Sequence, residues 1–177
     1  PCWDRLHVRT RTMNARSLFL LLISFLAGCA SSRIEGVDVS AARAFYKQPT
    51  AQQLKTFRQN TVSDQLNLYF FGNQVRHPPA IYLARCFALN GKSAVVLLRS
   101  KLVEASGDLT VRDITMLFAT IDAMGTYDVA GDVQLMRALS ARVAKMQDEG
   151  WRDTAEKKIA SIGHERNERY GNAPECS

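Results

Sequence analysis

Apolar side chains that recur every three or four residues constrain the fold of this chain more than any other feature. The clearest run lies in residues 133–146 and consists of Val133, Met136, Leu139, Val143 and Met146. This spacing puts the side chains on one face of an α-helix, where they can be buried together. Similar stripes recur from about residue 50 to residue 162, and no segment alternates in the way a half-buried strand does. The sequence therefore predicts an all-α fold.

Residues that start or stop helices divide this region into segments. Thr50 to Gln53 has the form of a capping box, and another helix is expected to start at Thr61 or Ser63. Gly72-Asn73 and the prolines that follow are expected to end that helix. The later stripes predict helices at about residues 79–89, 92–105, 109–125, 133–146 and 151–162.

The connections between these segments are short, which favours antiparallel neighbouring helices. Two helix pairs stand out, at residues 79–105 and 109–147, and their second helices are expected to begin near Lys92 and Asp132. This offset of about 40 residues is similar to that of HEAT repeats, and the resemblance implies a short stack of helix pairs. A five- or six-helix bundle would produce the same stripes, so both architectures stay open.

A short leader-like segment precedes the helical region. Residues 13–16 carry a positive charge at Arg16, and Leu18 to Leu26 is almost wholly apolar. That apolar run is shorter than the roughly 20 residues that a helix needs to cross a bilayer. It is followed by Leu26-Ala27-Gly28-Cys29, which resembles the lipobox of bacterial lipoproteins.

The lipobox resemblance implies a processing scheme for the N-terminal part of the chain. Residues 13–28 would be a signal peptide, and Cys29 would carry acyl chains that anchor the protein in a membrane. Ala30 follows in place of an aspartate, which favours the outer membrane, with the protein facing the periplasm. An ordinary secretory signal or an N-terminal membrane helix is the alternative.

The same scheme divides the chain into five parts. Residues 1–12 would be an upstream extension ahead of Met13, and residues 29–40 a lipidated tether. The helical domain would span residues 41–165, and residues 166–177 would form a frayed tail.

The net charge of +6 does not indicate a nucleic-acid-binding protein. Residues 1–28 hold four arginines and one aspartate, a net charge of +3, and the rest of the chain holds 19 basic and 16 acidic residues, also +3. In this second part the two signs are mixed, without a basic block. We therefore expect no nucleic-acid partner.

Two cysteines remain after Cys2 and Cys29 are assigned to the extension and the anchor. Cys86 and Cys176 are an even number in an oxidising compartment and could form a disulfide. Alternatively, Cys86 is a free buried thiol on an apolar helix face. The sequence leaves both readings open.

No catalytic, cofactor-binding or metal-binding motif emerges from the sequence. Gly91-Lys92-Ser93 lacks both the earlier glycine and the preceding strand of a phosphate-binding loop. His77 and His164 have no second ligand at metal-binding spacing. Asp108 is expected to cap the helix that contains Val111.

The sequence therefore predicts a lipid-anchored, non-enzymatic lipoprotein whose helical domain binds a periplasmic protein. Repeat-like helical stacks offer extended surfaces that suit such partners. Two alternatives remain: an enzyme of the cell envelope with a site dispersed along the sequence, and an abundant structural lipoprotein.

Overall fold

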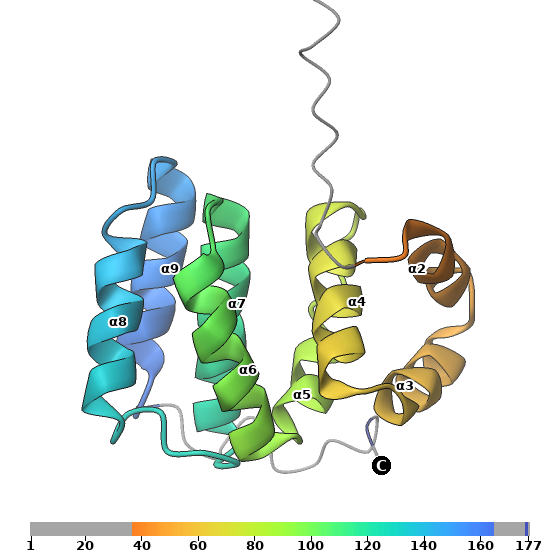
Figure 1. The fold of residues 1–177 in the computed structure, drawn as a ribbon, viewed down its shortest axis with the longest axis horizontal. Helices are drawn as coiled ribbons and strands as arrows, with labels where there is room; N and C mark the ends of the chain where they lie inside the picture. Colours follow the sequence, from red (N-terminus) through yellow and green to blue (C-terminus); the bar gives the residue numbers. More distant parts are fainter. Residues whose placement is uncertain (1–36, 165–175, 177) are drawn as a thin grey trace, which may run out of the picture. The chain divides into compact units, whose positions relative to one another are not determined.

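The computed structural model describes residues 37–164 and residue 176, and these residues form eight α-helices without a strand (Figure 1). The all-α prediction is confirmed, although the number of helices exceeds five or six. The helices are α2 (Val39–Tyr46), α3 (Thr50–Gln59), α4 (Val62–Gln74), α5 (Leu83–Ala88), α6 (Gly91–Glu104), α7 (Asp108–Ala123), α8 (Val133–Val143) and α9 (Glu149–Ser161).

Side-chain caps fix where several of these helices begin. Asp38, Thr61, Asp132 and Asp148 each accept a hydrogen bond from a backbone N–H in the first turn of α2, α4, α8 and α9, respectively. The predicted starts at Thr61 and near Asp132 are confirmed. Asp38 lies within the expected tether, so the first helix starts slightly before residue 41.

Three predictions about helix starts and ends are wrong. Pro49, not Thr50, precedes the first turn of α3, and no side chain caps that helix, so the capping box does not form. Helix α4 continues through Gly72 and Asn73 to Gln74. Asp108 lies inside α7, whose N-cap is Gly107, and therefore does not cap it.

Helix α7 lies at the centre of the packing. It contacts α4, α5, α6, α8 and α9, and its fully buried apolar side chains are Ile114, Leu117, Phe118 and Ile121. A helix with neighbours on so many sides needs apolar residues around most of its circumference. The wide apolar stripe of residues 111–124 meets this requirement.

Aspartates near the two ends of α7 hold the loops that surround it. Asp108 accepts hydrogen bonds from the backbone N–H groups of Gln147 and Asp148, at 2.8 and 2.7 Å, and so positions the start of α9. Asp122 is buried and accepts from the N–H groups of Ala130, at 3.1 Å, and Gly163, at 2.7 Å. Both carboxylates therefore satisfy backbone donors outside their own helix.

A disulfide joins Cys86 in α5 to Cys176, with the two Cα atoms 5.5 Å apart. Both cysteines are buried. The bridge closes a loop of 90 residues, and the helices α6, α7, α8 and α9 all lie within that loop.

The remaining N-terminal predictions lie outside the described residues. These are the upstream extension, the signal peptide, the lipobox with Cys29 and most of the tether; residues 165–175 of the predicted tail also lie outside. Within the part of the chain that the structure describes, no helix has the length and apolar character needed to cross a membrane.

Candidate functional site

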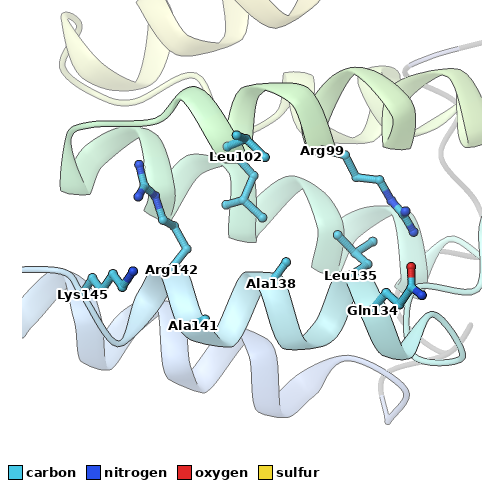
Figure 2. A pocket seen from close by; sticks show the side chains of 9 residues that line it. Arg99, Leu102, Gln134, Leu135, Ala138, Ala141, Arg142 and Lys145 are labelled. Carbon is cyan, nitrogen blue, oxygen red and sulfur yellow. The ribbon is translucent and has the colours of Figure 1, made fainter.

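A surface groove with a volume of about 500 Å³ lies between α6 and α8 (Figure 2). We call it the α6–α8 groove. It is lined by Arg99, Leu102, Val103, Gln134, Leu135, Ala138, Ala141, Arg142 and Lys145.

Helical spacing explains why these residues meet. On α8 the lining positions from Gln134 to Arg142 follow one another at intervals of one or three residues, so they share one stripe along the helix. The facing turn of α6 contributes Arg99, Leu102 and Val103. Leu102 and Leu135 are buried and form the floor, whereas the side chain of Val103 is 82% exposed, so the groove is open to solvent.

One end of the groove is fixed by Asp132. Its Oδ1 atom caps α8 by accepting from the N–H of Leu135 at 3.1 Å, and its Oδ2 atom accepts from the Tyr127 hydroxyl at 2.7 Å. Arg99 of α6 forms an ion pair with the same Oδ2 atom. The hydrogen bond from Tyr127 lowers the pKa of Asp132, and the Arg99 guanidinium acts in the same direction. Asp132 is thus held in the ionised form and joins α6 to the start of α8.

The other end of the groove is cationic. Arg142 and Lys145 lie near the C-terminal end of α8, and Figure 2 shows both side chains at the opposite end of the groove from Arg99. Neither side chain forms an ion pair within residues 37–164. No carboxylate lines the groove. Positive charge is therefore uncompensated at one end only.

A second polar cluster surrounds the buried Asp113 of α7. Arg112 donates to Oδ1 of Asp113 from Nε at 2.9 Å and from its terminal nitrogen at 2.6 Å, and Gln74 of α4 donates to Oδ2 at 3.1 Å. The Arg112 guanidinium also lies 4.3 Å from the centroid of the Trp151 ring of α9. Burial raises the pKa of Asp113, and Arg112 opposes this shift.

The Asp113 cluster links three helices and offers no access to a ligand. The side chains of Asp113 and Arg112 are only 3% and 12% exposed. Both oxygens of the carboxylate already accept hydrogen bonds. We therefore assign it a structural role.

The other residues considered in the sequence lie apart from the groove. His77 is exposed after α4, and His164 is exposed after α9. Gly91 has a φ of +50° and begins α6 directly after α5, so the segment around Lys92 is a helix-to-helix turn without a preceding strand. Cys86 is occupied by the disulfide. Within the described residues, no group of three or more His, Cys, Asp or Glu side chains is arranged to hold a metal ion.

The sequence stripes did not identify the α6–α8 groove, because they select residues that face the core. The groove consists mainly of residues beside that stripe, such as Ala138, Ala141 and Arg142. The only available signal was the pair of small residues at 138 and 141, followed by cations at 142 and 145, on one side of a predicted helix.

Comparisons of the chain with protein-family models, with curated proteins and with solved structures gave no match.

Proposed function

We propose that this chain is a lipid-anchored accessory protein of the bacterial cell envelope, which binds another protein and catalyses no reaction. The observation that carries the binding part of this proposal is the α6–α8 groove. It combines an apolar floor with uncompensated cations and is open to solvent. Its lining residues include no histidine, cysteine or carboxylate that could act as a general base or nucleophile.

The location of the protein is inferred from the leader. The short apolar run and Leu26-Ala27-Gly28-Cys29 support acylation of Cys29, so the first partner is membrane lipid. Ala30 supports attachment to the outer membrane, with the domain in the periplasm. The Cys86–Cys176 disulfide is an independent support, because disulfides persist in oxidising compartments such as the periplasm.

The charge distribution supports a protein partner over a nucleic acid. Cations and anions alternate over the helical region, for example in the pairs Lys101–Glu104 and Lys157–Asp153. A nucleic-acid site needs a continuous basic surface that neutralises several phosphates.

Substitution of Cys29 tests the anchor. In the Cys29→Ser variant we expect the protein to leave the membrane fraction, because the acyl chains can no longer be attached through the sulfur. Mass spectrometry of the wild-type protein should show an acylated peptide that begins at Cys29. Cys176→Ser serves as the matched control, because it also removes one sulfur and should leave membrane partition unchanged. Equal partition of all three proteins would contradict the proposed anchor.

A further inference from the structure

We propose that the α6–α8 groove binds an amphipathic helix of the partner protein whose acidic residues lie at one end. This inference rests on the proposed protein-binding function and names the kind of segment that is bound. It is carried by three properties of the groove: its length, its apolar floor and the placement of its charges.

The length of the groove fits a short helix. The lining residues of α8 run from Gln134 to Arg142, almost the whole of that helix, and Lys145 follows just after its C-cap. At 1.5 Å per residue this helical stretch is about 12 Å long, which corresponds to about two turns of a bound helix. A helix laid between α6 and α8 would bury one apolar stripe of residues at i, i+3, i+4 and i+7.

Small side chains on α8 allow a partner helix to approach the groove closely. Ala138 and Ala141 are exposed on α8 and carry only a methyl group, so a helix can pack against this part of α8 at short distance. Leu102 and Leu135 supply the apolar surface between the two helices, and Val103 adds an exposed side chain at the edge. Burial of such surface is favourable by about 25 cal/mol per Å².

The charges give the bound helix a direction. Arg99 is already paired with Asp132, so the end of the groove near the start of α8 is neutral. Arg142 and Lys145 have no carboxylate partner among the described residues, so the opposite end attracts anions. A partner helix with Asp or Glu at one end therefore fits in one orientation.

A second copy of this chain fits the groove less well. Within residues 37–164, an exposed acidic surface lies on α9, where Glu149, Asp153 and Glu156 stand at i, i+4 and i+7. That surface carries no stripe of exposed apolar residues, and Asp153 is already paired with Lys157. It would supply charge without burying the floor of the groove.

Photo-crosslinking of the full-length, membrane-anchored protein in intact cells tests this inference. A benzoylphenylalanine replaces Val103 at the edge of the groove, and the crosslinked peptide is sequenced by mass spectrometry. Val96 is the matched control, because it is also an exposed valine of α6 (61%) and does not line the groove. We expect a crosslink from position 103 to a protein segment with an apolar helical stripe and acidic residues at one end.

Charge reversal then tests the cationic end. The double variant Arg142→Glu and Lys145→Glu should weaken the crosslink from position 103 by about tenfold or more. Arg137→Glu makes the same kind of change on the exposed side of α8 outside the groove and should leave the crosslink within about twofold. Circular dichroism of each variant checks that the helices are intact.

Four outcomes would overturn the inference. Three of them are crosslinking of position 103 to lipid, to a second copy of this chain, or to a protein segment without acidic residues. The fourth is a crosslink whose yield is the same in the wild type and in the charge-reversed variant. If position 96 captures a protein and position 103 does not, the groove assignment fails while protein binding stands. If neither position captures a protein, the proposed function fails as well.

Discussion

At the scale of single residues, buried aspartates do more to connect this domain than its surface ion pairs. Asp122 is almost completely buried, and each of its oxygens accepts from a backbone N–H in a different segment. Exposed pairs such as Asp153–Lys157 join side chains within one helix, where solvent screens them. The position of Ala130 in the loop before α8 and that of Gly163 after α9 therefore both depend on one side chain.

Asp122→Ala should lower the free energy of unfolding by about 2–4 kcal/mol, because the N–H groups of Ala130 and Gly163 would lose the buried carboxylate that accepts from them. Asp153→Ala is the control and should cost less than about 0.5 kcal/mol. Urea denaturation of both variants measures the difference. Similar losses for the two variants would mean that the Asp122 hydrogen bonds contribute little.

Asp113 should contribute to the free energy of unfolding in a pH-dependent way, and the sign should be opposite to that of a carboxylate whose pKa is lowered on folding. Because burial raises its pKa in the folded protein, the folded state binds the proton more tightly than the unfolded state. Its contribution to stability is then fully present below the unfolded pKa and is lost as the pH rises through the folded pKa.

This contribution can be isolated with Asp113→Asn, which cannot titrate. The unfolding free energy of the wild type minus that of the variant should fall as the pH rises from its unfolded pKa of about 3.8 through the raised folded value. Denaturation curves collected from about pH 3 to about pH 6 give this difference. A difference that rises over the interval would show that Arg112 lowers the pKa of Asp113 more than burial raises it.

At the scale of helices, the sequence predicted which segments are helical better than it predicted which faces are buried. In α8 the predicted stripe began at Val133, yet this side chain is 57% exposed because it lies in the first turn, next to the Asp132 cap. The buried residues of α8 are Leu135, Leu139 and Val143. The sequence did not predict that Leu135 is buried, because it lies beside an almost regular apolar stripe and does not fit the spacing of that stripe.

Gly72 shows a similar limit within α4. A glycine followed by asparagine is typical of a helix end, but here the helix continues and the glycine gives room to a neighbouring side chain. A Cβ atom at position 72 would overlap the Tyr46 hydroxyl and lie 2.6 Å from Cβ of Ala80. The Tyr46 hydroxyl donates to the backbone oxygen of Leu68 at 2.7 Å, so it cannot move away without losing that bond.

Gly72→Ala should therefore lower the unfolding free energy by about 1–3 kcal/mol, although alanine favours helices in general. Gly107→Ala is the control, because a Cβ atom there meets nothing within 4 Å. Its cost should stay below about 1 kcal/mol, the difference between glycine and alanine at an N-cap. Thermal and urea unfolding distinguish the two effects, and a stabilised Gly72→Ala variant would contradict the packing around Tyr46.

At the scale of the whole domain, the all-α class and the approximate positions of the helices within residues 79–147 follow from the sequence. Apolar period, short connectors and capping residues act locally, so they can be recognised without knowledge of the fold. The α6–α8 groove, the Asp122 hydrogen bonds and the Cys86–Cys176 bridge join residues far apart in sequence. No local pattern specifies such contacts, because they depend on how the helices pack.

The disulfide should contribute to the stability of the domain as a whole. Cys176→Ala removes a crosslink that closes a loop of 90 residues and should lower the unfolding free energy by about 2–4 kcal/mol. Reductant should reduce the stability of the wild type to that of the variant and leave the variant unchanged. Thiol titration under denaturant should detect two additional thiols per wild-type molecule after reduction, and equal stability with and without reductant would contradict the prediction.

The disulfide also determines whether the two pieces of the chain separate after a single cleavage of the backbone. The loop that precedes α8 is exposed at Asp128 and Gly131 and lies between the two cysteines. If a protease cut the chain there, the piece that contains α2 to α7 would stay covalently attached, through Cys86 and Cys176, to the piece that contains α8 and α9. The severed protein would keep all the helices of the described region on one molecule, still covalently joined to the proposed lipid anchor at Cys29.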